Sequence, residues 1–97
     1  MTQNEIIDIL QTLKPQYQQE GIILVGLFGS FSRGEEKEGS DVDIVYEIEK
    51  GKKFSMFKYL KYLADLEKYL HRKVDLVRAE TIKSDLKPYI YKDMIYV

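Results

Sequence analysis

The hydrophobic pattern in the first half of the chain predicts one helix and two strands. Residues 3–19 carry apolar residues at roughly helical spacing and are predicted to be a helix capped by Thr2 or Asn4. Its apolar stripe consists of Ile6, Ile7, Ile9, Leu10 and Leu13. The almost unbroken apolar run Ile22 to Phe28 is typical of a central strand buried on both faces. A short helix over residues 30–33 and a charged loop precede a second strand, Val42 to Ile48.

The second half predicts a helix, a third strand and a less regular tail. Residues 54–70 are expected to form the longest helix, with Phe54, Met56 and Tyr59 near its buried face. That face is assigned to Phe57, Leu60, Leu63, Leu66 and Leu70. Val74 to Val77 is the third strand, and Ile82, Leu86, Ile90 and Ile95 are expected to pack a final helix, continuous or split at Pro88. This element order predicts an α+β fold with a small mixed sheet and flanking helices.

Length and composition restrict the architecture to one domain covering residues 1–97. Such a chain has no room for a separate substrate domain, so a large substrate would be a partner protein. The absence of cysteine excludes disulfides and thiolate metal sites. The N-terminus lacks signal-peptide features, and no apolar run reaches the ~18 residues needed to cross a bilayer. We therefore expect a cytoplasmic protein with no membrane association.

Charge is distributed unevenly although the net charge is only −1. Residues 31–50 carry three basic and seven acidic side chains, whereas residues 51–92 carry eleven basic and five acidic ones. The basic half is suited to phosphates or to an acidic partner. The alternative is that its lysines only solvate a helix and the loop before it.

Three aspartates are the principal candidates for chemistry. Asp41 and Asp43 are two residues apart on a predicted strand and should share one face, while Val42 and Ile44 face the core. Two such carboxylates repel each other unless a cation or proton intervenes, and Mg²⁺ favours carboxylate and phosphate oxygens. If the third strand lies beside the second, Asp75 completes a triad able to hold two Mg²⁺ ions about 3.5–4 Å apart. The alternative is a pair of turn or edge-strand aspartates without a ligand.

The turn between the first strand and the short helix is the second candidate feature. Gly29 allows a sharp turn and a close approach to a ligand, and Ser30 offers a hydroxyl and a backbone N–H. Both suit the phosphates of a nucleotide triphosphate. Arg33, further along, would reach a phosphate oxygen or pair instead with Glu35 or Glu36. The segment is not a Walker loop, because no Gly-Lys-Ser/Thr follows at the required distance.

The segment from Leu27 to Gly34, with Ser40-Asp-Val-Asp-Ile44 after it, closely resembles the minimal nucleotidyltransferase family of the polymerase-β-like superfamily. The resemblance covers the whole chain and makes Asp75 the expected third carboxylate. It implies a mixed sheet with flanking helices, Mg²⁺, and ATP or another nucleotide triphosphate as substrate. Gly29 and Ser30 would handle the triphosphate, and Asp41, Asp43 and Asp75 would hold metal.

The resemblance also implies a partner, because many such small proteins are antitoxins of prokaryotic toxin–antitoxin pairs. The toxin is then a HEPN-domain ribonuclease, and the antitoxin transfers AMP to one of its tyrosines. The leading hypothesis is therefore a Mg²⁺-dependent protein adenylyltransferase acting as an antitoxin. A non-catalytic antitoxin that masks its toxin by binding is the alternative, and nucleotidyl transfer to a small molecule ranks third. Direct nucleic-acid binding is not expected, because the tyrosines show no basic–aromatic repeat.

Overall fold

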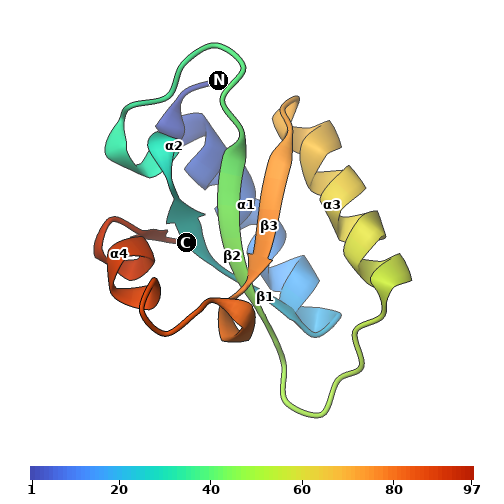
Figure 1. Cartoon of the computed structure of the whole chain (residues 1–97). Coiled ribbons are helices and arrows are strands. Elements are labelled where there is room, and N and C mark those ends of the chain that lie inside the picture. Colours follow the sequence, from blue (N-terminus) through green and yellow to red (C-terminus); the bar gives the residue numbers. More distant parts are fainter.

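Four strands form one mixed sheet that carries two long helices on one of its faces (Figure 1). This computed structural model describes residues 1–97. The elements in chain order are α1 (Gln3–Gln19), β1 (Ile22–Phe28), α2 (Ser30–Arg33), β2 (Val42–Ile48), α3 (Met56–Leu70), β3 (Val74–Arg78), a 3₁₀ turn η1 (Ala79–Thr81), α4 (Lys87–Lys92) and β4 (Ile95–Tyr96). The predicted α+β architecture with a mixed sheet is confirmed. No helix is long and apolar enough to span a membrane.

The sheet has the strand order β3-β2-β1-β4. β1 runs antiparallel to both β2 and β4, whereas β2 and β3 are parallel and are joined by the crossover helix α3. Because β2 and β3 are parallel and β1 is antiparallel to them, the end of β1 meets the beginnings of β2 and β3. This arrangement collects the residues of three separate segments at one edge of the sheet.

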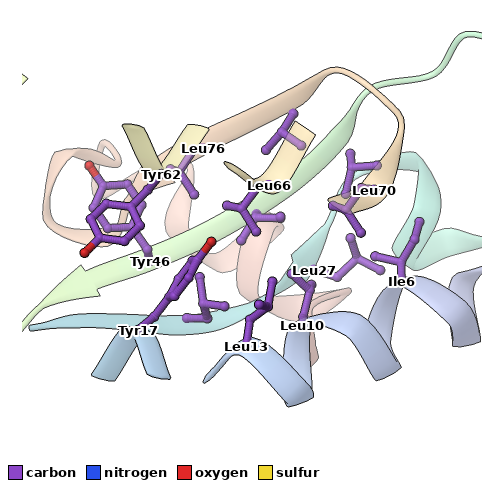
Figure 2. Close-up of a cluster of buried hydrophobic side chains, with 14 of the residues drawn as sticks. Ile6, Leu10, Leu13, Tyr17, Leu27, Tyr46, Tyr62, Leu66, Leu70 and Leu76 are labelled. Carbon is purple, nitrogen blue, oxygen red and sulfur yellow. The ribbon is translucent and has the colours of Figure 1, made fainter. Parts of the chain in front are cut away.

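The main core lies between the sheet and the helices α1 and α3, as Figure 2 shows. Thr2 caps α1 through a reciprocal capping box with Glu5, which fixes the start of the helix. From α1 the core receives Ile6, Leu10, Leu13 and Tyr17, and from α3 it receives Tyr62, Leu66 and Leu70. Tyr17 and Tyr62 contact each other edge to face, with ring centroids 4.9 Å apart. The helix-facing side of the sheet is therefore closed by side chains of both helices.

The predicted buried face of α3 is partly wrong. Leu66 and Leu70 are buried, but Phe57 and Leu60 are exposed and Tyr62 takes their place in the core. The helix has apolar residues on two sides, and periodicity cannot decide which side meets the sheet. The expectation that α3 is the longest helix is also wrong, since α1 has 17 residues and α3 has 15.

The tail differs from the final helix, continuous or split at Pro88, that was expected. Pro88 lies in the first turn of α4 and does not split it, because a proline there removes no helical hydrogen bond. Ile95 belongs to β4, which pairs with β1, and Leu86 is exposed. A Cβ added at Gly26 would lie 2.6 Å from the Met94 side chain, so the glycine lets the tail pack against β1. The tail thereby covers part of the second face of the sheet.

Candidate active site

Asp43 and Asp75 are register partners on the parallel strands β2 and β3. Phe28, the last residue of β1, is the partner of Asp43 on the other side, so the Gly29 turn lies next to the same carboxylate. Val42 and Ile44 are fully buried in the helix-side core, as predicted from strand alternation. The predicted adjacency of the second and third strands is also confirmed, and it puts Asp75 beside Asp43.

The three aspartates differ in their exposure to solvent. Asp41, directly before β2, is exposed, Asp43 is half-buried, and Asp75 is exposed. The strand position of Asp75 therefore does not bury its charge. None of the three ion pairs of the chain involves these carboxylates. Their negative charge is consequently not neutralised by a salt bridge within the protein.

The carboxyl of Asp43 has the most perturbed acidity of the group. Burial, and after it the negative charges of Asp75 and Asp41, together raise its pKa to about 6. The Arg33 guanidinium acts in the opposite sense and only partly offsets these effects. A half-buried carboxylate near two others favours either a proton or a bound cation, which is the electrostatic environment of a metal ligand.

The donor set fits Mg²⁺ chemically, although the aspartates do not form a complete cage. No group of three or more His, Asp or Glu side chains is arranged to hold a metal ion by itself. Mg²⁺ in phosphoryl-transfer sites is usually held by one or two carboxylates together with waters and substrate phosphates. Asp43 and Asp75, which are adjacent on the sheet, match a site of this kind, in which nucleotide phosphates and waters supply the other ligands. They match it better than a site in which three aspartates hold the metal without nucleotide. The metal role of all three aspartates stays a prediction.

Gly29 is required by its backbone conformation and by its distance from Asp43. Its φ is +75°, a value that side-chain-bearing residues rarely adopt, and it precedes the first residue of α2. A Cβ at this position would lie 2.1 Å from Oδ2 of Asp43. The Ser32 hydroxyl donates a hydrogen bond of 2.8 Å to the Gly29 carbonyl and holds the turn. Ser30 therefore begins α2 directly beside the half-buried carboxylate, where a phosphate contact was predicted.

Arg33 forms an ion pair with Glu35, one of the two acidic partners that the sequence suggested for it. Its Nε donates to Oε1 of Glu35 at 2.5 Å, and both side chains are largely exposed. An exposed pair of this kind contributes little to stability and is readily exchanged for another anion. The guanidinium also lies near enough to Asp43 to lower the pKa of that carboxyl. Its predicted phosphate contact remains untested.

Arg72 holds two parts of this edge together and was not identified from the sequence. Its Nη1 donates a hydrogen bond of 3.1 Å to the carbonyl of Ser40, the residue before Asp41. Its guanidinium also lies 5.0 Å from the ring centroid of Phe31, which is fully buried in α2. Arg72 thus ties the loop that leads into the aspartates to the helix that follows Gly29.

A cleft of about 710 Å³ opens beside this edge. Its lining includes Asp41 together with His71, Arg72 and Lys73, the three residues between α3 and β3. His71 is the C-terminal cap residue of α3 and has a φ of +53°. The cleft does not lie over the Asp43–Asp75 pair, so it adjoins the carboxylates and does not contain them.

Comparison with known proteins gives the family of the chain. Residues 4–97 match the nucleotidyltransferase domain family. A protein of Methanocaldococcus jannaschii, provisionally named a protein adenylyltransferase, is 40% identical over 101 residues, which is 99% of this chain and 98% of that protein. The protein adenylyltransferase MntA of Thermococcus cleftensis is 36% identical over 98 residues, covering 100% of this chain and 97% of the relative.

Solved structures agree with the fold. A protein provisionally assigned as a minimal nucleotidyltransferase superposes with a TM-score of 0.82 at 24% identity, covering 100% of this chain and 97% of its own. A toxin–antitoxin complex with AMP-PNP gives a TM-score of 0.68 at 24% identity over 99% of this chain and 72% of that chain. The complex of a tri-AMPylated Shewanella oneidensis HEPN toxin with an MNT antitoxin gives a TM-score of 0.58 at 22% identity. The match covers 97% of this chain and 66% of that chain. The predicted family, fold and enzyme class are thereby confirmed: the chain belongs to the nucleotidyltransferase domain family.

Proposed function

We propose that this protein transfers AMP from ATP to a hydroxyl group of a partner protein and thereby acts as an antitoxin. The observation that carries the proposal is the strand register, in which Asp43 has the Gly29 turn on one side and Asp75 on the other. Relatives that match this chain almost end to end are named protein adenylyltransferases, which supports AMP as the transferred group.

Each predicted site residue has a role in this proposal. Gly29 and Ser30 bind the triphosphate through the backbone and the hydroxyl of the turn, and Arg33 exchanges Glu35 for a phosphate oxygen. Asp41, Asp43 and Asp75 bind the metal, two Mg²⁺ ions in the full complex. When bound, Mg²⁺ neutralises phosphate charge and increases the acidity of the attacking hydroxyl.

The reaction is an in-line displacement at the α-phosphorus of ATP. The acceptor oxygen forms a bond to this phosphorus while the bond to the bridging oxygen of the β-phosphate breaks, so pyrophosphate leaves. The acceptor proton passes to a carboxylate, for which Asp75 is the candidate because it is exposed at the rim of the site. The half-buried Asp43 is the less accessible of the two and is suited to a fixed metal ligand.

The acceptor is expected on a HEPN-type toxin. One chain in a complex of an MNT antitoxin with an AMPylated HEPN toxin shares the fold of this chain, which supports that class of partner. One small domain with its carboxylates on an open sheet edge offers no enclosed pocket around Asp43 and Asp75 for a small acceptor. We propose a cytoplasmic enzyme that uses neither a membrane nor nucleic acid as a partner.

The test is transfer of label from ATP to the purified product of the neighbouring gene as the candidate partner. With Mg²⁺, we expect label from α-³²P-ATP to appear on the partner and label from γ-³²P-ATP not to appear, because only AMP is transferred. Transfer from the γ-position would identify a kinase, and failure with both nucleotides, by a folded protein that binds ATP, would refute the proposal.

The double variant Asp41→Ala/Asp43→Ala separates catalysis from simple masking. We expect it to lose transfer by at least about 10³-fold while still binding the partner, because both proposed metal ligands are gone. If the double variant neutralises the toxin as well as the wild type at the same expression level, the antitoxin acts by binding alone.

A further inference from the structure

The outer face of α3 exposes a row of large apolar side chains. Met56 is 69% exposed, Phe57 86% and Leu60 52%, and the small exposed residue Ala64 continues the row by one further turn. We define these four residues as the α3 stripe. Single exposed apolar residues are ordinary, but a contiguous row on one helix marks an interaction surface.

The helical phase directs the α3 stripe away from the sheet. Tyr62, Leu66 and Leu70 define the side of α3 that is buried in the main core. At 100° per residue, Phe57 and Ala64 lie about opposite the centre of that buried side. Rotating α3 to bury Phe57 would expose Leu66 and Leu70, so the stripe is not a misplaced part of the core. Figure 1 shows that no other element packs on this outer side.

Positive charge borders the N-terminal part of the α3 stripe. Residues 51–64 contain Lys52, Lys53, Lys58 and Lys61 and no acidic residue. All four lysines are exposed, and only Lys61 forms an ion pair, a 4.0 Å contact with Glu20. An apolar row with lysines before its first turn and along one flank is complementary to an apolar ridge flanked by carboxylates. Two copies of this chain facing each other here would bring like charges together, so self-association through the stripe is disfavoured.

The α3 stripe is remote from the catalytic edge. α3 runs from the end of the sheet where β2 stops to the end where β3 begins, and Met56, Phe57 and Leu60 occupy its first two turns (Figure 1). The aspartates lie at the opposite end, where β2 and β3 start. A partner bound on the stripe therefore leaves Asp43 and Asp75 open to nucleotide and acceptor.

We infer that the α3 stripe is the docking surface for the partner protein, and that it receives an apolar helix ridge bordered by acidic side chains. This inference rests on the proposed function for the existence of that partner. It assigns partner binding and chemistry to separate surfaces. Affinity comes from burial of Phe57 and its neighbours, and the flanking lysines accelerate association with an acidic surface.

The decisive variant is Phe57→Asp, tested with the same purified partner protein as the transfer assay. Phe57 is the second residue of α3, where a carboxylate is favourable to the helix, so the variant is expected to fold. We expect affinity for the partner to fall by roughly 30-fold or more, as for a central aromatic residue of an interface. Binding of ATP should remain unchanged. Calorimetry measures both affinities, and circular dichroism checks the fold.

Tyr89→Asp is the matched control. Tyr89 is an exposed aromatic residue, 74% accessible, in the first turn of the short helix α4. We expect this variant to bind the partner within about twofold of the wild type. Equal losses for Tyr89→Asp and Phe57→Asp, or no loss for Phe57→Asp, would overturn the inference.

A triple variant, Lys53→Glu/Lys58→Glu/Lys61→Glu, tests the flanking lysines. We expect slower association with the partner and a weaker dependence of affinity on salt than in the wild type. Vesicles containing anionic lipid are tested in parallel. Binding to vesicles that is lost in Phe57→Asp, without binding to the partner, would assign the stripe to a membrane and overturn the inference. A concentration-dependent dimer that is abolished by Phe57→Asp would also overturn the inference, because it would assign the stripe to a second copy of this chain.

Failure of this inference is distinguishable from failure of the proposed function. If the wild type transfers AMP and Phe57→Asp does so with unchanged KM for the partner, the function stands and the docking surface is wrong. If the wild type transfers no AMP but binds the partner through Phe57, the docking surface stands and the chemistry is wrong.

Discussion

The two faces of β2 differ in what they do for the protein. On one face Val42, Ile44 and Tyr46 are buried beneath α1 and α3 in a sixteen-residue core. On the other, Val45 joins a cluster of only four buried residues, and Asp43, two positions earlier, remains half-open. Because side chains alternate along a strand, one segment serves stability on one face and chemistry on the other.

The difference arises from how far each face is covered. The tail covers Val45 through Ala79, Ile82 and Met94, but Asp43 lies nearer the sheet edge and is not part of that cluster. Incomplete cover leaves the carboxylate partly desolvated and still accessible to a ligand. A fully covered face would exclude the nucleotide, and a fully exposed one would leave the acidity of Asp43 close to its ordinary value.

Truncation on the helix-covered face should have the largest effect on stability. Leu66 is fully buried in the main core, so Leu66→Ala is expected to lower the free energy of unfolding by about 2–5 kcal/mol. Leu60→Ala removes the same atoms from the exposed side of the same helix and should cost less than about 1 kcal/mol. Urea denaturation measures both. Similar losses for the two variants would contradict the assignment of inner and outer faces.

Adding a methyl group on the catalytic face should disturb both stability and activity. Gly29→Ala forces Cβ against Oδ2 of Asp43 and strains a residue with φ of +75°, so a loss of about 1–3 kcal/mol is expected together with reduced AMP transfer. The control is Gly34→Ala, where φ is +70° but no atom lies within 4 Å of the added Cβ. Gly34→Ala should therefore lose only the stability that corresponds to its backbone strain.

A double-mutant cycle separates the two contributions at Gly29. In an Asp43→Ala background, Gly29→Ala should cost about as much stability as Gly34→Ala in the wild type, because the clashing carboxylate has been removed. An unchanged cost in that background would mean that Gly29 is required for its backbone conformation and not for its proximity to Asp43.

The raised pKa of Asp43 predicts a pH-dependent gain in stability from Asp43→Asn. The folded pKa of about 6 lies above the reference value of 3.8, so the ionised carboxylate destabilises the fold. The stability that the protonated group provides is present below about pH 4 and is lost as the pH rises through 6. With EDTA present, Asp43→Asn should be more stable than the wild type by about 1–2 kcal/mol at pH 8, allowing for solvent screening.

Thermal unfolding between pH 4 and pH 8 checks this expectation. The two proteins should have similar melting temperatures at pH 4 and diverge as the pH rises. Mg²⁺ with ATP should then raise the melting temperature of the wild type and not that of Asp43→Asn. A wild type that is the more stable protein at pH 8 without metal would show that the three carboxylates do not repel one another as proposed.

The sequence allowed the catalytic edge to be predicted because its signals are local. Alternation of Val42, Asp43 and Ile44 shows the buried and open faces directly, and Gly29 ends an apolar run. The orientation of α3 was not predictable in the same way, since both of its sides carry apolar residues. β4 was not predicted, because its two residues form a strand only by pairing with β1, which is distant in sequence.

Arg72 carries no local signal either, since its contact with Ser40 spans 32 residues of sequence, and its substitution should have the smallest effect. Arg72→Ala removes the hydrogen bond to the Ser40 carbonyl and the contact with the Phe31 ring, which should cost about 1 kcal/mol. Because Ser40 precedes Asp41, we also expect kcat for AMP transfer to fall several-fold with little change in KM for ATP. Arg72→Lys should restore less than half of kcat, since an ammonium group lacks the planar fork. Lys73→Ala, one position along the same cleft, is the control. If it lowers kcat equally, the effect comes from the positive charge of the cleft and not from the link between the loop and α2.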